Sequence, residues 1–303
     1  MANVNIQELL DNGVHFGHLT RKWNPNMAPY IYTERNGVHI IDLYKTAAKI
    51  EETSEALKKI ANSGRKILFV ATKKQAKDIV AEKSKAVDMP FITERWPGGM
   101  LTNFITIRKA VKKMALIDRM KTDGSFEALS KREKLQINRQ REKLEKNLGS
   151  ISDMTRLPGA LFIVDIKKEH IAVAEAQKLS IPIFAMVDTN SDPRQVDYVI
   201  PANDDASKSI NVVLSFVTDA IAEGLSERKA DKEKVKETKE VAAATKAEKA
   251  TPKVEEVKAA TPKVEEVKAK EAKAPKAEEV KVEETKVEET KTEVTETPTE
   301  EKK

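Results

Sequence analysis

Four carboxylates in the second half of the chain have the residue types and positions of a cation site. Asp188, Asp192, Asp204 and Asp205 follow two apolar runs that we expect to be strands. Carboxylates at the carboxyl edge of a parallel sheet occupy its usual ligand position and could hold a hydrated Mg²⁺. Two alternatives compete: Asp192 precedes a proline and suits a turn, and Asp204 or Asp205 suits a helix N-cap. The sequence therefore leaves a structural Mg²⁺ site as one of three alternatives for these aspartates, and no other cofactor is expected.

Two of the four histidines, His15 and His18, are three residues apart, a spacing that would place both imidazoles on one face of a helix. Gly17 interrupts this segment and no H-E-x-x-H pattern occurs, so packing or a hydrogen bond to RNA is favoured over a metal. We expect His39 and His170 to be structural.

Motifs of nucleotide-dependent and nucleophilic enzymes are missing from the sequence. The ten glycines match neither the G-x-G-x-x-G fingerprint nor the P-loop, and no G-x-S-x-G elbow occurs. The chain has no cysteine, which excludes disulfides, thiolate catalysis and Cys-ligated zinc and fits a reducing compartment. We expect no enzymatic activity and no small-molecule substrate; a nucleotide-dependent α/β enzyme is the least favoured alternative.

Two segments combine cations with flat side chains: residues 20–26 (TRKWNPN) and 93–103 (TERWPGGMLTN). Arg and Lys neutralise phosphates, Trp can stack on splayed bases, and Gly permits close backbone approach. Trp23 and Trp96 are candidates for stacking, but packing against the body is favoured for each. The RNA-binding candidates, from these segments, a turn and a helical arm, are Arg21, Lys22, Arg35, Arg95, Arg108, Lys109 and Lys112.

The charge is unevenly distributed along the chain. Residues 1–150 carry 28 Lys and Arg against 17 Asp and Glu, whereas residues 151–225 carry 6 against 11. This asymmetry predicts one face for a polyanion, and an acidic face that would suit a protein partner. We recognise no signal peptide and no apolar run that would span a membrane, and we expect a soluble cytoplasmic protein.

Alternating elements must position these side chains. A short helix is expected at 5–12, a hairpin about Asn36-Gly37, and a helix at 43–62. Strand-like runs then alternate with helical patterns, which predicts parallel strands with right-handed crossovers. The expected strands are 67–71, 90–93, 160–165, 181–187 and 198–200, and the expected helices are 73–87, 168–179 and 206–223.

Residues 104–150 interrupt this alternation with two long helical patterns on either side of a turn at 122–125. They predict an antiparallel coiled-coil arm inserted into an α/β body formed by 1–103 and 151–225. Between 105 and 150 the arm has 13 basic and 6 acidic residues, which favours RNA contact. Residues 226–303 lack Phe, Tyr, Trp, Ile, Met and Gly and contain short repeats, so we expect a low-complexity, disordered tail.

Several motifs occur in order across residues 1–225: 13–18 (GVHFGH), 23–27 (WNPNM), 35–42 (RNGVHIID), 95–103 (RWPGGMLTN), 158–162 (PGALF) and 187–193 (VDTNSDP). Together they resemble the bacterial ribosomal protein S2 family. The resemblance implies a three-layer α/β/α body with a five-stranded parallel, flavodoxin-like sheet and a coiled coil inserted after its second strand.

The same resemblance implies a function. It points to a structural constituent of the small ribosomal subunit that binds small-subunit rRNA. It also implies that the protein helps to dock neighbouring ribosomal proteins, including the large multi-OB-fold first protein of that subunit. A free RNA-binding regulator is the alternative.

Overall fold

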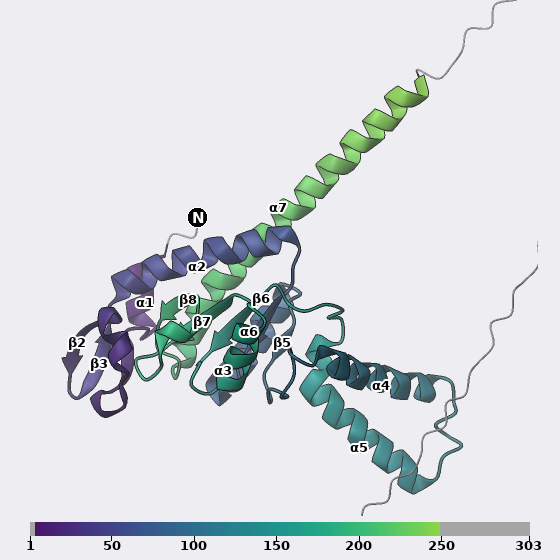
Figure 1. The fold of residues 1–303 in the computed structure, drawn as a ribbon, viewed down its shortest axis with the longest axis horizontal. Coiled ribbons are helices and arrows are strands. Elements are labelled where there is room, and N and C mark those ends of the chain that lie inside the picture. Colours follow the sequence, from purple (N-terminus) through teal and green to yellow (C-terminus); the bar gives the residue numbers. More distant parts are fainter. Residues whose placement is uncertain (1–3, 249–303) are drawn as a thin grey trace, which may run out of the picture. The chain divides into compact units, whose positions relative to one another are not determined.

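The computed structural model describes residues 4–248, with side chains through residue 231. Its centre is a five-stranded sheet with helices on both faces (Figure 1). The strands lie in the order β5-β4-β6-β7-β8, and every adjacent pair is parallel. They are β4 (Ile67–Val70), β5 (Phe91–Ile92), β6 (Ala160–Val164), β7 (Ile183–Val187) and β8 (Tyr198–Pro201).

This strand order confirms the predicted doubly wound, flavodoxin-like fold class. The direction in which successive strands are added reverses at β4, so β4 and β6 flank the switch point of the sheet. All five residues of β6 and of β7 are buried, as expected for parallel strands covered on both faces.

Two apolar cores cover the two faces of the sheet. On one face, Phe69, Phe162 and Phe184 belong to the core formed with α2 (Leu43–Ser63), α3 (Lys74–Ala86) and α7 (Ser207–Glu248). On the other face, Leu68 and Leu161 belong to the core formed with α6 (His170–Lys178) and the base of the arm. Because successive strand residues alternate between faces, each strand supplies both cores.

The N-terminal segment forms a second, antiparallel sheet in the order β1-β3-β2. Asn36 and Gly37 connect β2 to β3 with φ values of 52° and 75°, the backbone that the predicted Asn-Gly hairpin needs. Strand β1 was not predicted, since its four residues include Gly17 and its partner β3 is not the next strand along the chain. The elements are α1 (Ile6–Asp11), β1 (Phe16–Leu19), η1 (Thr20–Lys22), η2 (Pro25–Tyr30), β2 (Ile31–Arg35) and β3 (Val38–Ile41).

The predicted arm consists of α4 (Phe104–Thr122) and α5 (Lys131–Leu148), inserted after β5 and followed by η3 (Gly149–Ile151). Ser130 and Glu133 form a capping box that starts α5. Arg141 of α5 pairs with Asp118 of α4 and so joins the two helices. Apolar residues at the base of the arm pack on the second core, which fixes the arm to the sheet: Phe104, Ile107, Val111 and Leu144.

Helix α7 (Ser207–Glu248) runs well beyond the predicted end at residue 223 and into the segment assigned to the tail. Glu, Lys and Ala continue the helix there because they are strong helix formers. Lys58 of α2 also pairs with Glu223 and Glu227 across this boundary. The disorder predicted for residues 249–303 lies outside the described residues.

The first part of α7, residues 207–231, is long and apolar enough to cross a membrane, contrary to the sequence expectation. More than half of its most apolar window is buried inside the fold. Its apolar residues Val213, Val217 and Ile221 belong to the core on the α2 side of the sheet. The composition therefore fits a core helix of the α/β body.

Candidate nucleic-acid interface

A lysine at the carboxyl edge of the sheet forms ion pairs with carboxylates that follow two other strands. Lys73 follows β4, Asp165 follows β6, and Asp204 and Asp205 follow β8. Lys73 Nζ lies 3.1 Å from Asp165 Oδ2, 2.7 Å from Asp204 Oδ1 and 2.8 Å from Asp205 Oδ1. Burial alone would lower the pKa of Lys73, but these carboxylates outweigh it and raise the pKa, so the ammonium stays charged.

His18 reaches the same cluster from β1. Its Nδ1 lies 2.9 Å from Asp188 Oδ2, and its Nε2 lies 3.2 Å from Asp205 Oδ2. The hydrogen bond with Asp188 is the main cause that raises the pKa of His18, and burial opposes it. Because β1 is a strand, His15 and His18 do not share a helical face; His15 lies against Phe16 instead.

Asp204 is the most deeply buried carboxylate of the cluster. Burial, followed by the charges of Asp188 and Asp165, raises its pKa to about 7, although Lys73 lowers it. Its Oδ2 has no hydrogen-bond partner among the described residues. Asp204, Asp188 and His18 each offer one atom that could coordinate a metal ion, and these three atoms lie within 4.8 Å of one another. This arrangement is compatible with a bound cation.

The structure gives the other two aspartates of the predicted cation site, Asp192 and Asp205, different roles. Asp205 is engaged by Lys73 and His18. Asp192 is the N-cap of the short helix η4 (Pro193–Gln195) and accepts a hydrogen bond from the Arg194 N–H, the turn role given as an alternative. Neither Asp204 nor Asp205 caps α7: the side chain of Asn203 accepts the hydrogen bonds of the Asp205 and Ala206 N–H groups.

Trp96 is a packing residue held by Glu175 of α6. Trp96 is 6% exposed, and its Nε1 donates to Glu175 Oε1 at 3.1 Å. The backbone N–H groups of Gly99, Leu101 and Thr102 also donate to this carboxylate, at 2.8, 2.9 and 3.1 Å. Burial alone would raise the pKa of Glu175, but these donors outweigh it and lower the pKa. The loop from β5 to α4 is therefore ordered around one carboxylate.

Trp23 differs from Trp96, because it is 39% exposed. Its ring centroid lies 5.1 Å from that of His39, so one part of the indole packs while the other faces outward. His39 is buried, in keeping with its expected structural role.

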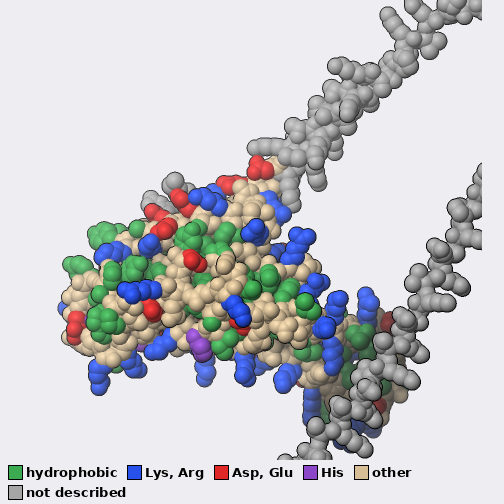
Figure 2. All heavy atoms as spheres, viewed as in Figure 1, with side chains coloured by type: hydrophobic (Ala, Val, Ile, Leu, Met, Phe, Trp, Pro, Cys, Tyr) green, Lys and Arg blue, Asp and Glu red, His purple; other side chains and the backbone are tan. Residues whose placement is uncertain are grey.

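The seven RNA-binding candidates lie in four places. Two are in η1, one ends β2, one is in the loop that Glu175 orders, and three are on α4. All seven are exposed, and none forms an ion pair with a described residue: Arg21, Lys22, Arg35, Arg95, Arg108, Lys109 and Lys112. Figure 2 shows Lys and Arg side chains gathered along one rim of the body and over the arm.

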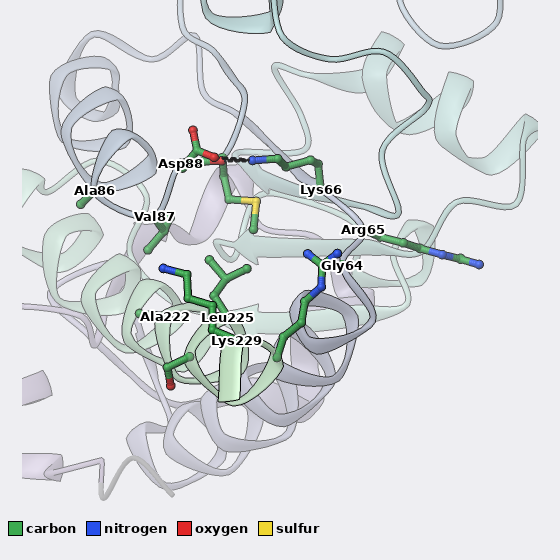
Figure 3. Close-up of a pocket in the computed structure, with 12 residues that line it drawn as sticks. Gly64, Arg65, Lys66, Ala86, Val87, Asp88, Ala222, Leu225 and Lys229 are labelled. Carbon is green, nitrogen blue, oxygen red and sulfur yellow. Dashed lines mark hydrogen bonds and ion pairs between the residues drawn. The ribbon is translucent and has the colours of Figure 1, made fainter. Parts of the chain in front are cut away.

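A cavity of about 410 Å³ opens between α7 and the C-terminal ends of α2 and α3 (Figure 3). Two of its basic residues contact residues at the ends of these helices. The Arg228 side chain covers Gly64, at the end of α2, and Lys66 Nζ donates to Asp88 Oδ2, just after α3, at 2.7 Å. Arg65 points away from the other lining side chains. Among the lining residues there is no acid–base pair that would suit catalysis.

Comparison with known proteins decides between the remaining interpretations. The family model described as ribosomal protein S2 matches residues 9–224. Proteins named small ribosomal subunit protein uS2 are similar over most of the chain. The one from Flavobacterium johnsoniae is 74% identical over 84% of this chain and 100% of its own, and the one from Parabacteroides distasonis is 63% identical over 84% and 92%. This chain belongs to the ribosomal protein S2 family.

In this family member, the charge that residues 151–225 present at the surface differs from the net charge counted along their sequence. Five of the 11 acidic residues between 151 and 225 are buried, whereas all six basic residues there are exposed. The expected acidic face is therefore weaker at the surface than its sequence indicates. The buried acids are Asp165, Glu169, Glu175, Asp188 and Asp204.

Proposed function

We propose that this protein binds small-subunit rRNA through exposed cations of its N-terminal segment, of the loop from β5 to α4, and of its arm. As a member of the ribosomal protein S2 family, it is a structural constituent of the small ribosomal subunit. The observation that carries RNA binding is the set of seven exposed cations that pair with no described carboxylate. Such side chains replace counterions on phosphates without first breaking an internal ion pair.

Shape and backbone contacts dominate this binding mode. Arg108, Lys109 and Lys112 are exposed on α4, whose base is packed on the sheet core through Phe104 and Ile107. A-form RNA hides its base edges in a deep groove, so a fixed row of cations reads phosphate positions. The body and arm together hold RNA helices at a set spacing.

The partner proteins belong to the same proposal. We infer that the protein helps to dock neighbouring ribosomal proteins, including the large multi-OB-fold first protein, and works in the cytoplasm without enzymatic activity. Asp219 and Glu223 of α7 are exposed and suit a basic protein surface, although Glu223 also pairs with Lys58 of α2. Reversing both charges should weaken docking in a pull-down with purified small-subunit proteins; unchanged docking would count against this face.

A divalent cation at the carboxyl edge is a separate proposal. Asp188 and Asp204 would supply oxygen and His18 nitrogen. Mg²⁺ prefers oxygen ligands and Zn²⁺ accepts nitrogen, so titration calorimetry with each ion alone distinguishes them. D204N should abolish the heat of binding, and D192N, outside the cluster, should keep it. If neither ion gave a heat of binding, the divalent-cation proposal would be contradicted, and Lys73 would be the cation that balances these carboxylates.

Sedimentation of cell lysate through a magnesium-containing gradient tests the main proposal. The protein should migrate stoichiometrically with the small subunit, and R108Q/K109Q/K112Q should reduce that fraction in moderate salt. K59Q/K83Q/K178Q, three lysines outside the candidate set, is the matched control. A wild-type protein that stayed at the top of the low-salt gradient would favour the free regulator.

A further inference from the structure

We propose that the carboxyl edge of the sheet is a further RNA-backbone contact surface, formed by Lys74, Lys167, Lys168 and Lys208. We call these four the edge lysines. None of them was among the sequence candidates. The inference rests on the proposed RNA-binding function and adds to it a surface on the body.

The first turn of α3 brings three segments together. Lys168 Nζ donates to the Thr72 carbonyl at 2.9 Å, so the segment before α6 lies against the entry to α3. On the other side, Ser207 Oγ lies 3.5 Å from the Gln75 carbonyl, which places the start of α7 beside the same turn. Lys74 lies between these two contacts. The edge lysines therefore surround one helix start although they are far apart in sequence.

The positive charge of this edge faces outward because the negative charge is buried beneath it. Asp165 and Asp204 are buried and bind Lys73. Glu169 is buried as well, and the backbone N–H of Thr72 donates to it at 3.1 Å. All four edge lysines are exposed, and none has an ion pair within the part of the chain that the structure describes.

The half-exposed carboxylate at this edge, Asp205, is already shared between Lys73 and His18. Lys22 lies in η1, which directly follows β1, and His18 of β1 places its Nε2 3.2 Å from Asp205 Oδ2. Lys22 is one of the seven RNA-binding candidates. The edge lysines thus continue the proposed interface from the N-terminal sheet onto the body.

Helix orientation adds to the positive potential. In a parallel α/β fold the helices after β4, β6 and β8 begin at the carboxyl edge, and their N-termini carry partial positive charge. The N-cap position of α3 is Lys73, which makes no side-chain capping hydrogen bond. Compact, hydrated ammonium groups above such helix starts suit phosphate oxygens, bound by charge without base reading.

Salt-dependent binding to full-length small-subunit rRNA tests this surface. In filter binding from about 50 to 200 mM KCl, K74Q/K167Q/K208Q should bind about tenfold more weakly than wild type. The slope of log K against log salt should fall by about 2, since each lost phosphate contact removes about 0.7–0.9. K74R/K167R/K208R should bind as wild type does, because it keeps the charge.

The control K59Q/K83Q/K178Q removes the same charge from elsewhere on the body and should leave both quantities near wild type. Equal affinity and slope for the edge and control variants would overturn the inference while leaving the proposed function intact. Failure of the wild type to bind RNA would instead remove the proposed function. An edge variant that keeps RNA affinity but loses a co-sedimenting protein would assign this surface to a protein and overturn the RNA assignment.

Discussion

Lys73 Nζ lies 2.7 Å from Oδ1 of Asp204, a carboxylate with no exposed surface. The side chain of Lys73 is itself only 12% exposed, so this ion pair is shielded from solvent. Within the described cluster, Lys73 and His18 face four carboxylates, and removing either cation leaves buried negative charge uncompensated.

Replacing Lys73 with methionine should therefore destabilise the fold. Breaking a buried ion pair by removing one partner costs about 3–5 kcal/mol, so the free energy of unfolding should fall by that amount in urea titration. Lys74→Met, at the exposed neighbouring position, should change it by less than about 0.5 kcal/mol. Equal effects of the two substitutions would show that the Lys73 pairing adds nothing to stability.

Glu175 should make stability depend on pH at the acidic end. Its folded-state pKa is lowered from 4.5: burial alone would raise it, but the four N–H groups that donate to the carboxylate outweigh that effect. The unfolded chain takes up a proton first, so this stabilisation is complete above about pH 4.5 and is lost as pH falls towards the lowered pKa.

Glu175→Gln should cost about 3 kcal/mol near neutral pH, since an amide leaves some of these donors unsatisfied. It should also flatten the decline in unfolding free energy between about pH 5 and 3. Glu82→Gln, an exposed acid of α3 without an ion pair to a described residue, serves as control. A pH profile of Glu175→Gln that matches wild type would contradict this role.

The two tryptophans should respond differently to a solvent quencher. W96F retains only Trp23, which is 39% exposed, and W23F retains only Trp96, which is 6% exposed. Acrylamide should quench W96F fluorescence more strongly than W23F fluorescence. W96F should also lose about 1–2 kcal/mol of stability, because the Glu175 carboxylate loses the indole donor. Similar quenching in both variants would contradict the packing assignment of Trp96.

Gly17 should not tolerate alanine. An added Cβ would lie 2.6 Å from Thr189 Cγ2, and Thr189 Oγ1 accepts the backbone hydrogen bond of His18. Gly17→Ala should therefore cost about 1–3 kcal/mol in thermal or urea unfolding. Gly98→Ala provides the control, because its Cβ would meet nothing within 4 Å. Equal stability of the two variants would show that β1 can shift away from Thr189.

Local patterns in the sequence determined most of the fold. The apolar runs predict the five parallel strands, because a strand buried on both faces needs an unbroken apolar stretch, as in β6. Asn36-Gly37 predicts its hairpin because the turn needs two residues with positive φ. Exposed cations such as Lys109 could also be predicted, since helical periodicity places Lys109 opposite the apolar residues of its helix.

Only the tertiary structure decided which charges meet. Lys73, His18 and Asp204 come from three distant segments, and they come together because parallel strands end at one edge and β1 packs beside it. The nearest sequence signal for Lys73 was its place between the apolar run 67–71 and the helix predicted to follow it. Burial also separates sequence charge from surface charge: Asp165 and Glu175 count as acidic in the chain, yet the fold encloses them, and the exposed lysines define the surface. Sequence periodicity carries no record of such contacts, because they depend on how the elements pack.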